Sequence, residues 1–137
     1  MVFAGTNYLA IVLAAVASYG FGALYYGALG KRWMAALGKV AAELKENSSI
    51  TPFVVSFIAL LVMATVLAGV MGHLGPGQVT LRNGLISAGF VWTGFVATTL
   101  ATNHAFQGAR PSLTFSDGGH WLGVLLIQGA IIGGMGV

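Results

Sequence analysis

The side chains able to do chemistry gather at one predicted end of the molecule. Most come from residues 103–120, and two tyrosines end an earlier apolar stretch on the same side. The set comprises Tyr25, Tyr26, Asn103, His104, Gln107, Arg110, Ser116, Asp117 and His120. Two histidines and one aspartate could ligate a metal. The structural alternative is that Asn103 and Asp117 cap helix ends, Arg110 meets lipid phosphate or Asp117, and the tyrosines form an interfacial aromatic belt.

The spacing of these residues argues against a metal centre and against catalysis. The interval from His104 to His120 crosses a proline-containing loop, and no HExxH-like helix face presents both rings. The chain has three acidic residues, two of them in the linker between spans one and two, and no cysteine, so neither a carboxylate pair nor a thiol nucleophile can be assembled in the membrane. Ser116 and His120 have only helical spacing, which arises by chance. We therefore expect a polar site without metal or cofactor, and no enzyme.

One strongly polar side chain, Gln128, falls near the middle of the last apolar segment. It either hydrogen-bonds a neighbouring helix or lines a narrow polar path. We favour the interhelical bond, which contributes on the order of 1 kcal/mol in membranes.

The composition indicates that these residues are carried by a membrane protein. The chain has 57% hydrophobic and 7% charged residues, with a mean hydropathy of +0.88. Soluble domains have roughly one-quarter charged residues. The net charge of +3 rests on six scattered basic residues, which does not suggest nucleic-acid binding.

Four apolar stretches predict an all-α fold: a compact bundle of four transmembrane helices in a single domain, residues 1–137. Each holds about twenty residues, which at about 1.5 Å per residue matches a hydrocarbon core of about 30 Å. Thr51, Thr80 and Asp117 are predicted helix caps, and Gly75-Pro76-Gly77 is a predicted tight turn between antiparallel helices. The spans are expected at about 7–29, 52–71, 81–101 and 119–137.

The linker between spans one and two has its own helical pattern. Trp33, Leu37, Val40 and Leu44 recur at helical spacing, which predicts a short amphipathic helix over about 31–46 lying on the inner leaflet. The alternative is a docking helix for a partner protein.

Basic residues predict the orientation. Four lie between spans one and two and Arg110 lies between spans three and four, whereas only Arg82 lies on the opposite side. The positive-inside rule then places both termini outside and the polar cluster inside.

Small residues form stripes on three of the predicted spans. They are Ala10, Ala14, Ser18 and Gly22 in the first, Gly84 and Ala88 in the third, and Gly129 and Gly133 in the fourth. Such residues let helix backbones approach closely in lipid. Three such faces exceed what a minimal bundle needs, so we expect a homo-oligomer or a place in a larger membrane complex.

Several short motifs resemble one family. They are Asn7-Tyr8-Leu9-Ala10-Ile11, Gly22-Ala23-Leu24-Tyr25-Tyr26, Gly30-Lys31, Trp33-Met34, Asn103-His104-Ala105-Phe106, Arg110-Pro111 and the glycine-rich Gly129-Ala130-Ile131-Ile132-Gly133. Together the chain resembles DUF1761, small bacterial membrane proteins of unknown function. The resemblance implies a four-span protein of the bacterial inner membrane and supplies no activity, ligand or catalytic residue.

Two functions remain open on the sequence. The favoured one is a structural or accessory membrane subunit whose glycine faces bind further copies or a larger complex, with lipid as the other partner. The alternative is a small channel or carrier for a neutral small solute or ion, with Gln128 and hydroxyls lining the path. The lack of charge at mid-depth in the spans favours the first.

Overall fold

The computed structural model describes residues 2–3, 5–38 and 49–137. Four helical segments in it are long and apolar enough to cross a membrane, which confirms the expected number of spans. One of the four is a continuous helix built from α4, η1 and α5. The elements are β1 (Val2–Phe3), β2 (Thr6–Asn7), α1 (Tyr8–Leu37), α3 (Thr51–Gly72), α4 (Leu81–Val91), η1 (Trp92–Ala97), α5 (Thr98–Gln107) and α6 (Pro111–Met135).

Helix α1 is longer than the sequence suggested. It continues through Lys31 and Arg32 to Leu37 instead of ending near Leu29. The first residues assigned to an interfacial helix, including Trp33, therefore belong to α1. Residues 39–46, the rest of that predicted helix, lie outside the described residues.

Helix α6 begins earlier than expected, at Pro111 rather than near Gly119. Proline is favoured in the first helical turn because its missing N–H has no partner there. Ser116, Asp117 and His120 therefore project from a helix and not from a loop, and Asp117 does not cap it. Only residues 108–110 separate α5 from α6, with Gly108 in the left-handed conformation at φ 66°.

Two of the helix starts show different capping. Thr80 caps α4 as predicted, because its hydroxyl accepts a hydrogen bond from the Asn83 N–H at 3.2 Å. The prediction for Thr51 is wrong: Thr51 lies inside α3, whose N-cap is Ile50, and no side chain caps that end. The predicted turn between α3 and α4 is present, with Gly75 and Gly77 at φ 110° and 76°.

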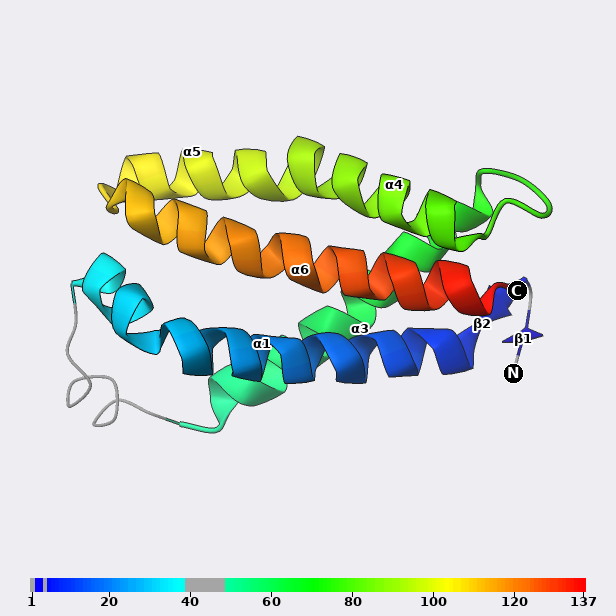
Figure 1. Cartoon of the computed structure of the whole chain (residues 1–137), viewed down its shortest axis with the longest axis horizontal. Helices are drawn as coiled ribbons and strands as arrows, with labels where there is room; N and C mark the ends of the chain where they lie inside the picture. The colour runs from blue at the N-terminus through cyan, green and yellow to red at the C-terminus, as the bar shows by residue number, and fades with distance from the viewer. Residues whose placement is uncertain (1, 4, 39–48) are drawn as a thin grey trace.

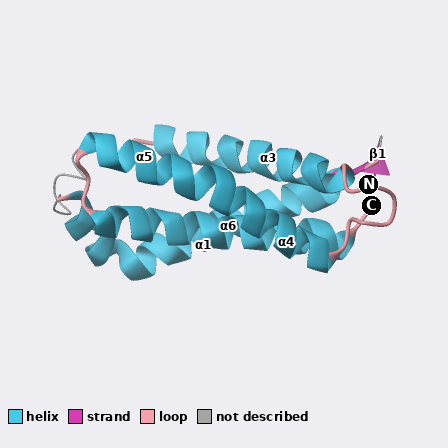
Figure 2. Ribbon diagram, turned by 90° about the horizontal axis from the view of Figure 1, so that it is seen from above, coloured by secondary structure: helices cyan, strands magenta, loops and turns pink. Residues whose placement is uncertain are grey.

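Helix α6 lies at the centre of the bundle. In Figure 1 it runs between α1 on one side and the α4–α5 helix on the other, with α3 crossing behind. It contacts every other long helix and has the largest buried share of the four spans. Figure 2 shows the helices along one long axis with their connections gathered at the two ends.

Glycine permits the closest helix contact. Gly84 of α4 and Gly129 of α6 meet back to back: a Cβ built on Gly84 would lie 1.9 Å from the Gly129 carbonyl oxygen. Gly133 has the same relation to the backbone of Thr80, at 2.1 Å. Ala88 packs beside Gly129, so this predicted small-residue face is used inside the bundle.

The stripe on α1 also packs within the chain. Ala10, Ala14 and Ser18 are fully buried, and a Cβ on Gly22 would lie 3.0 Å from His120 Nε2 of α6. All eight small residues therefore have an intramolecular role, which removes the reason for which the sequence favoured packing between subunits. Association itself stays a prediction.

Both termini lie at the same end of the bundle (Figure 1). The Asn7 side chain joins them: its carbonyl oxygen caps α1 at Ala10 N, and its amide donates to the Gly136 carbonyl at 3.0 Å. β1 and β2 form a small antiparallel hairpin beside this contact, which was not predicted.

We expect Gly84→Ala to lower the free energy of unfolding by about 1–3 kcal/mol, because the new methyl group overpacks the crossing of α4 and α6. Thermal unfolding in a mild non-ionic detergent measures this. Gly89→Ala is the matched control, since nothing lies within 4 Å of its Cβ position and alanine raises helix propensity. Equal midpoints for the two variants would contradict the close crossing.

Candidate functional site

A cavity of about 670 Å³ lies among α1, α3 and α6, near the end of the bundle where α3 begins. Helix α1 lines it with Ser18, Tyr19, Gly22, Ala23, Tyr26, Trp33 and Leu37; α3 contributes Phe53, Ser56 and Leu60; and α6 contributes Asp117, His120 and Trp121. Most of the wall is apolar. Its size and lining are typical of small-molecule sites, which are mostly apolar with a few convergent polar groups.

Asp117 is the charged group of this cavity. The Tyr26 hydroxyl donates to its Oδ1 at 2.7 Å, and its Oδ2 lies 3.9 Å from His104 Nε2. The carboxyl side chain is 20% exposed. Among the described residues it is the only acidic one, since Glu43 and Glu46 lie outside them.

His104 reaches Asp117 from α5. It is held by a hydrogen bond between its Nδ1 and Thr114 Oγ1, at 2.8 Å. Ala88 packs on α6. In a regular α-helix each residue turns by about 100°, so His104 would lie about 160° around the helix axis from Ala88 and would point away from α6. The π-helix η1 absorbs about one residue between them and so turns His104 towards α6.

Trp92 stands at the start of this π-helix. Its indole N–H donates to the Gly118 carbonyl oxygen of α6 at 2.9 Å. The bond ties the irregular turn to the helix that carries Asp117, which is one residue before Gly118 in the sequence.

Aromatic rings surround His120, whose own side chain is buried. Ring centroids of Tyr26 and Trp121 lie 4.8 and 4.7 Å from its centroid, and Phe21 stacks nearly parallel at 6.1 Å. Its Nδ1 is buried without a hydrogen-bond partner among the described residues. The imidazole therefore serves as part of an aromatic wall.

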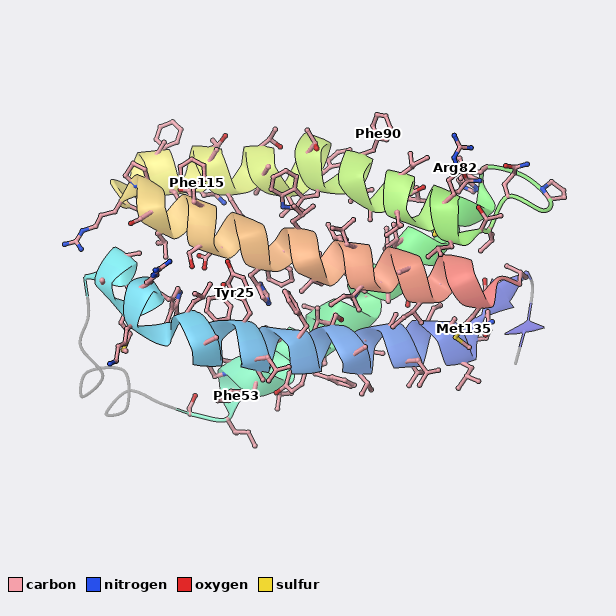
Figure 3. The ribbon with its side chains drawn as sticks, viewed as in Figure 1. Tyr25, Phe53, Arg82, Phe90, Phe115 and Met135 are labelled. Atoms are coloured by element: carbon pink, nitrogen blue, oxygen red, sulfur yellow. The ribbon has the colours of Figure 1, made fainter. Side chains whose placement is uncertain are left out.

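Glycines of α6 admit the rings of α1. A Cβ on Gly119 would lie 2.9 Å from the Tyr25 hydroxyl, and one on Gly123 would lie 2.4 Å from the Phe21 ring. Tyr25 reaches across to donate to the Ser116 carbonyl at 2.7 Å, and Figure 3 shows it between the two helices. These two glycines were missed, although their spacing of four residues is that of Gly129 and Gly133.

Gln128 binds two helices at once. Its Nε2 donates to Ser18 Oγ of α1 and to the Leu60 carbonyl of α3, both at 3.1 Å. The side chain is fully buried. Because Ser18 and Leu60 also line the cavity, Gln128 lies at its inner end.

One protein family, DUF1761, described as proteins of unknown function, matches residues 9–133. The chain belongs to this family. The resemblance seen in the sequence is thereby confirmed over nearly the whole chain. No curated protein and no solved structure matches this DUF1761 chain.

The structure of this DUF1761 member brings together most of the predicted polar set. Tyr25, Tyr26, His104, Asp117 and His120 converge between α1, α5 and α6. The Tyr25 and Tyr26 hydroxyls bond to Ser116 and Asp117 of α6, and a position of these rings at the membrane interface stays a prediction. No group of three metal-ligating side chains is found within the described part of the chain.

Three members of the predicted set, Asn103, Gln107 and Arg110, are exposed and lie outside the cavity lining. Asn103 is exposed on α5 and caps no helix, because α5 ends at Gln107 with Gly108 as its cap. Arg110, expected at lipid phosphate or Asp117, instead donates to the Ala35 carbonyl near the end of α1. A cation there complements the partial negative charge of a helix C-terminus.

Gln128→Leu is expected to lower the free energy of unfolding by about 1 kcal/mol, because interhelical hydrogen bonds in membranes are worth about 0.6 kcal/mol on average and up to about 1.7. A double-mutant cycle with Ser18→Ala, measured by unfolding in mild detergent, isolates the bond between them. The two effects should not add. Strict additivity would contradict a direct contact.

Proposed function

We propose that this protein is a solute-binding protein of the membrane, with the cavity among α1, α3 and α6 as its binding site. The observation that carries the proposal is a cavity of about 670 Å³ whose apolar wall bears one carboxylate. The cavity is open on one side, where Ala23, Phe53 and Ser56 are exposed, so its lining atoms lack contacts that an occupant would supply.

The binding site supports a carrier better than an open channel. A path through the bundle would have to pass Gln128, but that side chain is fully buried and bonded to α1 and α3. Solute would enter beside the exposed lining residues Ala23, Phe53 and Ser56, between α1 and the start of α3, and would leave by the same opening unless the helices move. By the distribution of Lys31, Arg32, Arg110 and Arg82, the end where α3 begins faces the cytoplasm.

We propose no reaction at this site. Among the described residues, the cavity carries a single carboxylate; Ser18 and Tyr26 use their hydroxyls in hydrogen bonds, and the His120 imidazole packs against aromatic rings. Binding alone requires nothing more. Activity assays on any bound solute would test this part.

A role as a subunit of a homo-oligomer or of a larger complex remains a proposal, and the exposed apolar surface is where such contacts would form. The outer surface bears large exposed phenylalanines, among them Phe90, Phe95, Phe106 and Phe115 at 72% to 91% exposure, and Figure 3 shows Phe90 pointing outward. Apolar helices of this kind suggest lipid contact, and lipid alone accounts for the exposure. The mass of the purified protein in mild detergent decides between one copy and several.

The test of the binding site is occupancy by a neutral aromatic probe. We expect 4-bromotoluene to quench the tryptophan fluorescence of the protein saturably, because Trp33 and Trp121 line the cavity. Trp92→Phe serves as background, since it leaves only these two of the three tryptophans.

In that background, Ala23→Phe should weaken the saturable quenching at least tenfold by filling the cavity. Ala28→Phe is the matched control: Ala28 is also exposed on α1 but lies outside the cavity lining. Quenching that is unsaturable, or equally affected by both substitutions, would overturn the proposed site.

A further inference from the structure

The cavity combines one carboxylate with a curved wall of aromatic rings. We propose that its ligand is a small organic cation, a protonated or alkylated amine, whose ammonium group lies between Asp117 and the rings of Tyr26, Trp33 and His120. This inference rests on the proposed function and adds the chemical class of the ligand.

The rings form a wall that a cation can face. Tyr26 has its ring centroid 5.3 Å from that of Trp33 and 4.8 Å from that of His120, with interplanar angles of 62° and 47°. Trp121 continues the wall at 4.7 Å from His120 and an angle of 70°. All four line the cavity. Rings that pack at such angles present several faces to one volume, and a cation within about 6 Å of an aromatic centroid is attracted by its quadrupole.

The Asp117 carboxylate gives the cavity its negative charge. Asp117 lines the same cavity and is only partly shielded. Within the described residues, its one hydrogen-bond donor is the neutral Tyr26 hydroxyl, and its one contact with a basic side chain is His104 Nε2 at 3.9 Å. No lysine or arginine of the described chain contributes to the lining. The negative charge of Asp117 would repel an anionic ligand and attract a cation.

A metal ion fits this site less well than an ammonium group. Hard cations such as Ca²⁺ take about six to eight oxygen ligands. Within the described residues no three metal-ligating side chains come together. An alkylated amine needs no fixed coordination, only a counter-charge and ring faces.

His120 is the second observation that favours aromatic recognition. Its side chain is buried, and its Nδ1 has no hydrogen-bond partner in the described structure, which is unfavourable for a polar atom. A leucine there would avoid that cost. Imidazole is not among the rings that attract a cation strongly, so His120 contributes a flat polar ring beside Tyr26 and Trp121, which supply the aromatic faces.

Two sources could supply the ammonium group. One is a free amine in solution, and the other is the headgroup of an ethanolamine lipid, since the cavity lies toward one end of the bundle. Their shared chemistry is what the site recognises, and the experiment below separates them.

The experiment is isothermal titration calorimetry on the full chain in dodecyl maltoside, which carries neither charge nor ammonium. The probes are benzyltrimethylammonium and neopentylbenzene, a neutral isostere with carbon in place of nitrogen. We expect the cation to bind at least tenfold more tightly than the isostere. Asp117→Asn, which keeps an acceptor for Tyr26, should abolish that preference, and Asp117→Glu should retain most of it.

The outcomes separate this inference from the proposed function. Equal binding of both probes, or an unchanged preference in Asp117→Asn, overturns the cation while leaving the cavity as a binding site. Saturable binding of neither probe, together with no saturable quenching by 4-bromotoluene, overturns both. Unfolding midpoints of the variants exclude a loss of fold as the cause.

Adding phosphatidylethanolamine to the micelles identifies the source of the ligand. If the lipid headgroup occupies the site, the apparent affinity for benzyltrimethylammonium falls as the lipid is added, and phosphatidylglycerol has no such effect. If affinity is the same with both lipids, a free amine is the ligand.

Discussion

The close contact between α4 and α6 at Gly84 and Gly129 is the constraint on which the rest of the bundle depends. Two backbones that meet there leave no room for any side chain. In lipid there is little hydrophobic drive to bring helices together, so van der Waals contact at such points supplies much of the association. With α4 fixed against one side of α6, the opposite side is free to receive α1 and α3. Gln128, one residue before Gly129, bonds to both of them.

The same geometry leaves the cavity open at the other end of α6. Gly129 and Gly133 bring the start of α4 close to α6 near the termini. Toward the other end of α6, aromatic rings make its contact with α1. Gly119 and Gly123 accept Tyr25 and Phe21, whose side chains lie between the two backbones. The cavity therefore lies at the end of α6 that contacts aromatic rings, and not at the end where glycines bring the backbones together. Asp117 lies at the same end of α6 as the cavity, where His104 of the neighbouring α5 contacts it.

Composition was sufficient to predict four membrane helices, because long charge-free stretches have few other stable structures in lipid. Boundaries were harder. The sequence from Ser112 to Gly119 contains serine, threonine, aspartate and two glycines, which is typical of a loop, yet it forms the first turns of α6. In a membrane the backbone hydrogen bonds of a helix favour that structure even where helix propensity is low, because no water is present to bond the free N–H and C=O groups. The π-helix at 92–97 has no clear sequence signal, and without it the contact of His104 with Asp117 could not be foreseen. Residue types thus predicted the polar set, and helix register decided which of its members meet.

The central position of α6 bears on how the molecule is assembled. Of the four membrane helices it is the last to be synthesised, yet it contacts all the others. Helices α1, α3 and α4 therefore enter the bilayer before the surface that organises them exists. During that interval Ser18 and Tyr26 lack the partners that α6 supplies, Gln128 and Asp117. Insertion and packing are consequently separate stages for this chain. Because α6 comes last in the sequence, packing cannot be completed until α6 has been synthesised and inserted.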